Sequence, residues 1–162
     1  MSNFTIINLQ AATGTIAIIL GFQWWIRPRV ANLPVQEALL PFVYLNAFRY
    51  LGLTFMATGQ FYDGFSEDFL NRVGLLDFST AVLAIVAAIA LKHRWSAAIP
   101  LVWVFNVVGF GDLLTAFPQF FSLKLYDQDL GFIWLMFVTY GLASFLSHIY
   151  VFVRLAGNIR TK

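Results

Sequence analysis

The stretch of sequence that decides the fold runs from Phe69 to Leu91 and reads FLNRVGLLDFSTAVLAIVAAIAL. About 20 helical residues cross the hydrocarbon core of a bilayer, so this stretch is long and apolar enough to span a membrane. Four further stretches of the same kind occur at roughly Phe4–Ile26, Leu39–Tyr62, Ala97–Phe117 and Gly131–Leu155. We therefore expect an all-α integral membrane protein, in which five transmembrane helices form a single domain over residues 1–162.

The composition agrees with a membrane protein and excludes other classes. The chain is 60% hydrophobic and only 11% charged, whereas about 25% of the residues of a typical soluble domain are charged. It contains no Cys, which excludes disulfides, a cysteine nucleophile and thiolate metal ligands. Its ten Lys and Arg residues are scattered along the chain, so we expect no nucleic-acid partner.

Helix-ending and helix-starting residues indicate where the spans stop and begin. The Arg27-Pro28-Arg29 segment is expected to stop the first span, and Pro41 to lie in the first turn of the second, where a missing N–H costs little. Ser66 is expected to cap the third span, because acidic residues follow it in the first turn. Pro118 is expected to end or kink the fourth span, and the apolar segment from there to Tyr126 to lie at the membrane interface.

The distribution of charge predicts the orientation. With five spans, one side of the membrane receives most of the basic residues, namely Arg27, Arg29, Lys92, Arg94, Arg154, Arg160 and Lys162. The other side receives Arg72 and Lys124 together with the acidic Asp63, Glu67, Asp68, Asp127 and Asp129. Basic residues prefer the cytoplasmic side. We therefore expect the N-terminus outside and the C-terminus inside, in a bacterial cytoplasmic (inner) membrane.

One eleven-residue pattern occurs twice. N-x-V-G-x-x-D-x-x-T-A is found at Asn71–Ala81 in the third span and again at Asn106–Ala116 in the fourth. The polar members of each copy are Asn71, Asp77 and Thr80, and Asn106, Asp112 and Thr115. Because consecutive spans run in opposite directions, a duplicated helix here is an inverted repeat, an arrangement that places paired sites about an axis in the membrane plane. The Asn, Gly and Thr residues are also explained by simple helix packing.

Four ionisable residues lie inside the predicted spans: Arg49, Asp77, Asp112 and His148. At about 1.5 Å per residue, both Asp residues lie roughly 21–23 Å from the inner end, while Arg49 lies roughly 15 Å and His148 roughly 10 Å from it. Arg49 can extend toward the acids, whereas His148 suits either a lower layer with Asn106 or an access path from the inner side. One arginine neutralises one carboxylate, so the second must be protonated, share a proton, or pair with a protonated His148.

Several motifs together resemble a known group of proteins. They are Phe48-Arg49-x-x-Gly52-x-x-Phe55, Gly74-x-x-Asp77, Asn106-x-x-Gly109-x-x-Asp112 and the late His148. This set is similar to an uncharacterised family of small bacterial multi-pass membrane proteins with no assigned activity. The chain departs from that family at Phe105, where Trp is frequent, and in lacking a Pro-rich stretch before the histidine. The resemblance implies a bacterial membrane protein and supplies no catalytic role.

The sequence is compatible with three functions. The first is transport or conduction of a proton, ion or small solute, with Asp77 or Asp112 exchanging protons and Arg49 as a fixed counter-charge. The second is an accessory or binding subunit that holds a pigment, quinone or lipid. The third is an intramembrane isomerase or cyclase, in which an acid protonates an apolar substrate.

The expected site for a substrate or ion consists of Arg49, Asp77, Asp112, His148, Asn71, Asn106, Thr80 and Thr115. We expect no catalytic residue and no metal ligand, and the sequence leaves any cofactor open. The expected partners are the lipid bilayer and either further copies of the chain or a larger membrane complex.

Overall fold

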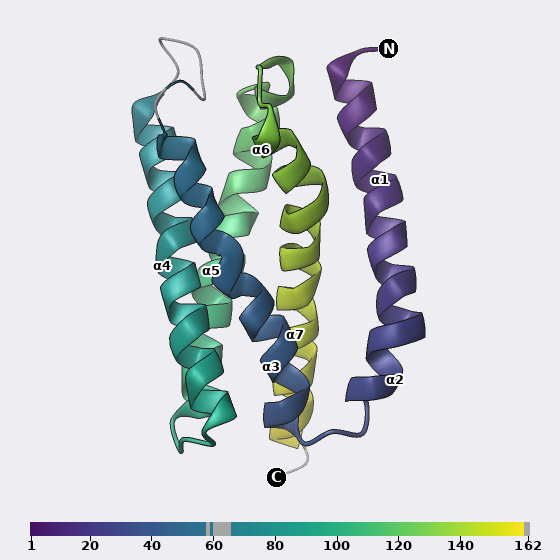
Figure 1. The fold of residues 1–162 in the computed structure, drawn as a ribbon, viewed down its shortest axis with the longest axis vertical. Helices are drawn as coiled ribbons and strands as arrows, with labels where there is room; N and C mark the ends of the chain where they lie inside the picture. The colour runs from purple at the N-terminus through teal and green to yellow at the C-terminus, as the bar shows by residue number, and fades with distance from the viewer. Residues whose placement is uncertain (58, 60–65, 161–162) are drawn as a thin grey trace.

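The computed structural model describes residues 1–57, 59 and 66–160. No strand occurs in these ranges, and five helical runs are long and apolar enough to cross a membrane. They lie side by side, with the N-terminus at one end of the bundle and the C-terminus at the other (Figure 1). The expectation of an all-helical fold with five helices long and apolar enough to span a membrane is therefore confirmed.

The first span is longer than expected. It consists of α1 (Asn3–Gly21), a π-helical turn η1 (Phe22–Ile26) and α2 (Arg27–Val30). The prediction that Arg27-Pro28-Arg29 stops this span is wrong, because these residues lie within the continuous helical run Asn3–Val30.

The second span differs most from its prediction. It starts at α3 (Val35–Leu45), four residues before the expected Leu39, and continues as the 3₁₀ helix η2 (Asn46–Met56). Pro41 therefore lies inside α3 and not in its first turn. The predicted end at Tyr62, and the neighbouring Asp63, lie outside the described residues, as does Lys162 at the other end of the chain.

The other three spans agree with their predictions to within a few residues. The third is α4 (Glu67–Lys92), where the Ser66 side chain accepts a hydrogen bond from the Phe69 N–H as an N-cap. The fourth is α5 (Ala98–Ser122), which continues through Pro118. The expectation that this proline ends the helix is therefore wrong, and the alternative of a kink stays a prediction. Much of the expected interfacial segment therefore belongs to α5, and a short 3₁₀ turn, η3 (Leu125–Asp127), follows. The fifth span joins α6 (Phe132–Leu135), the π-helical η4 (Met136–Gly141) and α7 (Leu142–Arg160).

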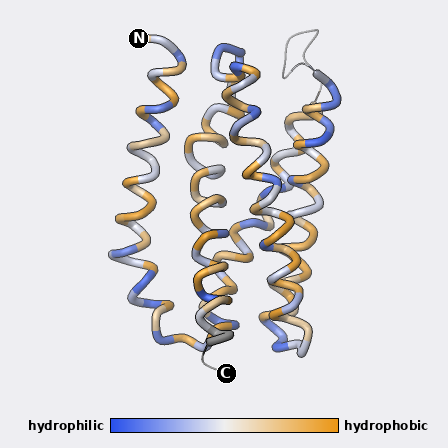
Figure 2. The backbone as a smooth tube through the Cα atoms, turned by 180° about the vertical axis from the view of Figure 1, so that it is seen from behind, coloured by the Kyte–Doolittle hydropathy of each residue, from blue (hydrophilic) through white to orange (hydrophobic). Residues whose placement is uncertain are grey.

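The predicted basic side of the protein gathers at one end of the bundle. The α2 segment, the end of α4 and the C-terminal end of α7 lie together at the lower end in Figure 1. Arg154 on α7 donates to the backbone oxygens of Ala31 and Leu33 after α2, and Arg94 forms an ion pair of 2.7 Å with Glu37. In Figure 2 hydrophilic residues mark the ends of several helices, while long hydrophobic stretches run between them.

Two apolar clusters form the core, one in each half of the bundle. The lower cluster packs α3 against the second half of α4, the first half of α5 and the end of α7. Its small members, Ala38, Ala84, Ala87, Ala88, Ala90 and Ala98, are buried, and small residues let helices approach closely in lipid. The upper cluster joins Ile7 of α1 to the start of α4, the end of α5, η3, α6 and η4. The ionisable residues of the spans lie between these clusters.

Candidate functional site

The 3₁₀ geometry of η2 builds one wall of the site. A 3₁₀ helix has three residues per turn, so residues three apart lie directly above one another. Asn46, Arg49, Gly52 and Phe55 have this spacing and follow one ridge of η2. In an α-helix three residues advance only about 300° around the axis, so each of these side chains would point about 60° away from the one before it. The 3₁₀ segment therefore presents the arginine, the glycine and an aromatic ring on the same side.

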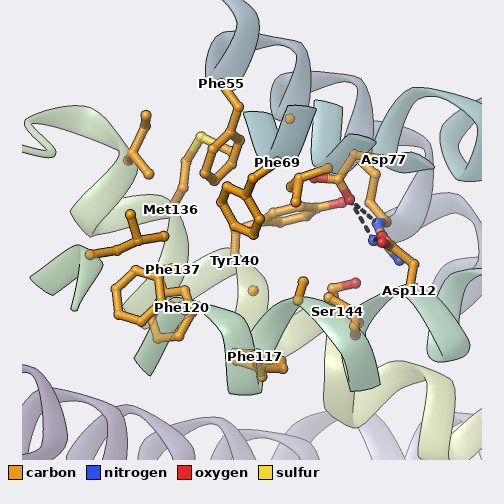
Figure 3. Close-up of a pocket in the computed structure, with 18 residues that line it drawn as sticks. Phe55, Phe69, Asp77, Asp112, Phe117, Phe120, Met136, Phe137, Tyr140 and Ser144 are labelled. Carbon is orange, nitrogen blue, oxygen red and sulfur yellow. Dashed lines mark hydrogen bonds and ion pairs between the residues drawn. The ribbon is translucent and has the colours of Figure 1, made fainter. Parts of the chain in front are cut away.

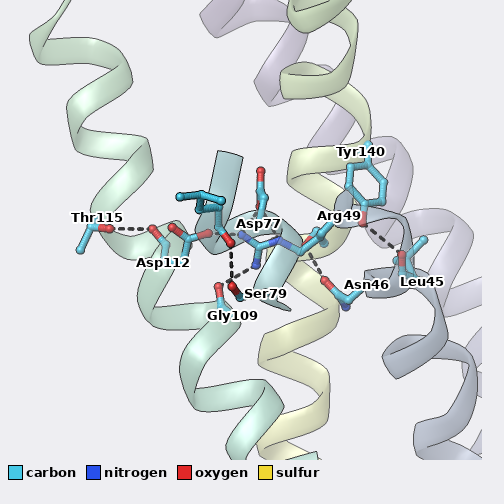
Figure 4. A network of polar contacts seen from close by, with 11 residues as sticks. Leu45, Asn46, Arg49, Asp77, Ser79, Gly109, Asp112, Thr115 and Tyr140 are labelled. Carbon is cyan, nitrogen blue, oxygen red and sulfur yellow. Dashed lines mark hydrogen bonds and ion pairs between the residues drawn. The ribbon is translucent and has the colours of Figure 1, made fainter. Parts of the chain in front are cut away.

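Arg49 joins three helices. Its Nε donates to Asp77 Oδ1 on α4 over 2.6 Å, and its Nη1 donates to the backbone oxygen of Gly109 on α5 over 2.8 Å. Its Nη2 donates to Asp112 Oδ2 on α5 and also pairs with Asp77. The arginine and Asp112 side chains are almost completely buried, and Asp77 is 17% exposed. Figure 4 shows both carboxylates converging on the guanidinium, as the matching depths in the sequence led us to expect.

The charges of this cluster do not balance. One guanidinium faces two carboxylates, so the cluster has a formal charge of −1 when both acids are ionised. Among the described residues no other basic side chain reaches either carboxylate, since Arg72 donates to Gln119 and His148 hydrogen-bonds to Asn106. A bound proton or a bound cation would make the cluster neutral, and an uncompensated charge is expensive inside a membrane.

Glycines allow these helices to meet. A Cβ atom added to Gly52 would fall on the Asp77 carboxylate, with the Asp77 Cγ only 2.5 Å away. A Cβ added to Gly109 would lie 2.6 Å from Thr80 Cγ2 and 2.7 Å from His148 Cε1. Real Cβ atoms essentially never approach other atoms this closely. Hydrogen at these two positions is therefore what lets η2 approach α4, and α5 approach α4 and α7.

A second polar layer lies toward the basic end of the bundle. His148 Nδ1 hydrogen-bonds to Asn106 Oδ1 over 2.7 Å, and the Asn106 amide donates to the His148 backbone oxygen. Asn46 of η2 donates to Ser147 Oγ over 2.8 Å and accepts from Ser144 Oγ over 2.6 Å. The structure thus brings His148 and Asn106 together, in a layer separate from the carboxylates.

The repeated residues occupy unlike environments. Thr80 is completely buried, and its hydroxyl has no hydrogen-bond partner among the described residues. Thr115 is exposed and donates back to the Asp112 backbone oxygen. Asn106 is buried in the lower layer, whereas Asn71 is exposed on the surface of α4. Of the predicted site residues, Asn71 and Thr115 therefore lie outside the site, and the duplication of the helix stays a prediction.

A cavity of about 80 Å³ adjoins the carboxylates. Arg49, Asp77 and Asp112 line it on one side, together with the hydroxyl-bearing Tyr140 and Ser144. Apolar side chains line the remainder, among them Phe55, Phe69, Phe117, Phe120, Met136 and Phe137. Figure 3 shows Met136, Phe120 and Phe137 on the side opposite the two acids.

Most of these cavity residues could not be identified from the sequence. Met136, Phe137, Tyr140 and Gly141 all belong to the π-helical η4, so two helices of irregular geometry, η2 and η4, meet at this cavity. Such departures from α-helical geometry are frequent at functional sites. One sequence signal was available, because Tyr140, Ser144 and Ser147 recur every three to four residues and mark a polar face of the last span.

The described residues contain no group of three or more His, Cys, Asp or Glu side chains arranged to hold a metal ion. The single histidine near the cluster has one ring nitrogen bonded to Asn106, and its Nε2 has no partner among the described residues. The acids and hydroxyls at the cavity can bind protons, cations and hydrogen-bond donors.

These features define a class of protein: a helical bundle with five helices apolar enough to span a membrane and an Arg/Asp/Asp cluster buried beside an aromatic cavity. A family model described as "Domain of unknown function (DUF8737)" matches residues 6–156, and the chain belongs to this family. The expectation of an uncharacterised family is thereby confirmed. No curated protein and no solved structure matches the chain.

Proposed function

We propose that this protein carries protons, or a small cationic solute in exchange for protons, across the membrane at the Arg49–Asp77–Asp112 cluster. The observation that carries this proposal is the pairing of two carboxylates with a single guanidinium inside the bundle. A permanently neutral structural ion pair needs only one acid. The second acid gives the cluster a place for one exchangeable positive charge, either a proton or a cation.

The surroundings of the cluster support exchange over a purely structural role. Asp77 keeps 17% of its side chain exposed, and both acids line the cavity, so a solute in the cavity can reach them. Arg49 is held by three groups on two helices, which suits a fixed counter-charge. Breaking a buried ion pair by removing one partner costs about 3–5 kcal/mol. Protonation of an acid in this cluster therefore also changes how strongly Arg49 holds the helices together.

The test is proton flux into liposomes that contain the purified protein. We expect Asp77→Asn and Asp112→Asn each to lower the flux at least tenfold, because each removes an ionisable group from the cluster. Asp68→Asn is the matched control, since Asp68 lies on the same helix as Asp77 but in its exposed first turn. Folding of each variant is checked by its thermal unfolding curve.

Flux that persists in both folded Asp→Asn variants, or is absent from the unaltered protein under an imposed proton gradient and added cations, contradicts this proposal. We propose that the protein lies in the bacterial cytoplasmic membrane with its N-terminus outside. Labelling of single Cys residues introduced near the two ends of the bundle tests that orientation, because the native chain has no Cys.

A second candidate function is that of a subunit within a homo-oligomer or a larger membrane complex. It is favoured by the loose packing of α1. This helix has nineteen residues, and of these only Ile7 is buried. Its exposed side includes Leu9, Ile16 and Ile19, which lipid or another chain can cover. Native mass spectrometry from nanodiscs tests this role: a strictly monomeric protein that still supports flux argues against it.

A further inference from the structure

The cavity beside the cluster combines two kinds of surface. Its polar side offers the carboxylates of Asp77 and Asp112 and the hydroxyl-bearing side chains of Tyr140 and Ser144. The Tyr140 hydroxyl already donates to the Leu45 backbone oxygen and the Ser144 hydroxyl to Asn46. Their oxygens can still accept, but Arg49 already binds one oxygen of each carboxylate. The polar side therefore offers four side-chain oxygens to a solute, one from each of Asp77, Asp112, Tyr140 and Ser144.

This supply of oxygen atoms argues against a bare metal cation as the solute. Hard cations such as Ca²⁺ take six to eight oxygen ligands, and Mg²⁺ demands an octahedral set. The cavity instead surrounds its acidic side with aromatic carbon. A cation whose charge is spread over carbon and nitrogen loses less hydration on entering such a site than a metal ion does.

The aromatic wall is organised around Phe137. Its ring stacks on Phe120 at 3.9 Å between centroids and meets Phe117 edge-on at 5.1 Å. All three rings line the cavity. Aromatic faces attract cations, and aromatic cages are the usual protein sites for quaternary ammonium groups. Carboxylates on one side and aromatic rings on the other therefore form a surface that complements an alkylammonium ion.

The size of the cavity limits the solute. At about 80 Å³ it is about half the size of the 150 Å³ engineered cavity that holds benzene. A solute that fits without rearrangement consequently has only a few non-hydrogen atoms. Amphiphiles with long chains and multi-ring compounds are too large.

We propose that the solute bound at this site is a small alkylammonium ion, with its charge against Asp77 and Asp112 and its methyl groups against the rings around Phe137. This inference rests on the proposed function, because it names the cation that would exchange with the proton.

The test compares a cation with a neutral molecule of nearly the same shape. Tetramethylammonium and tert-butanol are added together, at equal concentration, to the protein in nanodiscs of zwitterionic lipid. Saturation-transfer NMR then measures contact of the protein with each methyl signal, and empty nanodiscs supply the blank. We expect transfer to tetramethylammonium to exceed transfer to tert-butanol at least fivefold. Equal transfer, stronger transfer to tert-butanol, or no signal above the blank overturns the inference.

Two variants locate the binding. Asp112→Asn removes a charge, and Phe137→Leu removes a ring while keeping an apolar side chain. We expect each to lower the tetramethylammonium signal at least threefold and to leave the tert-butanol signal unchanged. The matched controls are Asp68→Asn and Phe132→Leu, because both residues are exposed and outside the cavity. An unchanged tetramethylammonium signal in both folded cavity variants contradicts the proposed location.

This experiment separates the two proposals. If proton flux depends on both acids but tetramethylammonium does not bind, the inference about the solute fails and the proposed function stands. If tetramethylammonium binds with the expected variant pattern but no flux occurs in any form, the site is a receptor for the cation and the proposed transport fails.

Discussion

Replacing Gly52 with Ala tests how the cluster is assembled. The added Cβ would fall on the Asp77 carboxylate and come too close to the Asp77 Cβ as well. Rotation of the carboxylate alone therefore cannot relieve the contact, and η2 must move away from α4. That movement stretches the bond of 2.6 Å between Arg49 Nε and Asp77.

The expected cost follows from two effects. Overpacking a well-packed interior costs about 1–3 kcal/mol, and removing one partner of a buried ion pair costs about 3–5 kcal/mol. Arg49 keeps Asp112 and the Gly109 backbone oxygen as partners, so only part of the second cost applies. We expect about 3 kcal/mol in total, which is about two orders of magnitude in the unfolding equilibrium constant.

The assay is equilibrium unfolding in mixed micelles with increasing mole fraction of dodecyl sulfate, followed by far-ultraviolet circular dichroism. Gly111→Ala on α5 is the matched control, because among the described residues no atom from another part of the chain lies within 4 Å of a Cβ added there. Alanine is the better helix former by roughly 0.5–1 kcal/mol, so this control should be neutral or slightly stabilising. Asp77→Ala is combined with Gly52→Ala to complete a double-mutant cycle.

The cycle decides whether the reasoning is correct. Because both changes disturb the same contact, we expect the double variant to lose less stability than the sum of the two single variants. Strict additivity within about 0.5 kcal/mol would show that the glycine and the acid act independently. A Gly52→Ala protein as stable as the Gly111→Ala protein would refute the close approach of η2 and α4.

Two further changes test other parts of the bundle. Gly109→Ala would place a Cβ 2.6 Å from Thr80 Cγ2 and 2.7 Å from His148 Cε1, so we expect the free energy of unfolding to fall by about 1–3 kcal/mol. In the same micelle assay, adding Thr80→Ser should recover part of this stability. No recovery would mean that the Thr80 methyl group is not the obstacle. Ser66→Ala removes the side chain that accepts from the Phe69 N–H, and we expect it to cost about 1 kcal/mol, while an unchanged unfolding midpoint would show that the cap does not contribute.

The spans could be predicted from the sequence because lipid allows few alternatives. Every backbone polar group in the hydrocarbon core must be satisfied within the protein, so a long apolar stretch forms a helix whatever its neighbours are. The Ser66 cap, the end of α4 near Lys92 and the meeting of Arg49 with the two acids could likewise be anticipated, since each depends on local chemistry or on depth.

The ends of several helices could not be predicted in this way. Arg27-Pro28-Arg29 and Pro118 have the composition of helix stops, yet both lie within helical runs. A proline is tolerated inside a membrane helix where neighbouring groups take over the freed carbonyl. Such compensation is a property of the packed protein and leaves no mark on the local sequence.

The division between sequence and tertiary structure is clearest at the site. The sequence by itself determined that the chain forms five helices apolar enough to cross a membrane and that an arginine and two acids share their interior, because hydropathy and position along a helix can be read residue by residue. Only the tertiary structure decided that η2 is a 3₁₀ helix, that Asn106 and Thr80 are buried while Asn71 and Thr115 are exposed, and that Phe137 and Tyr140 line a cavity beside the acids. The direction in which a side chain points is set by which helix packs beside it, and that choice depends on the whole bundle at once.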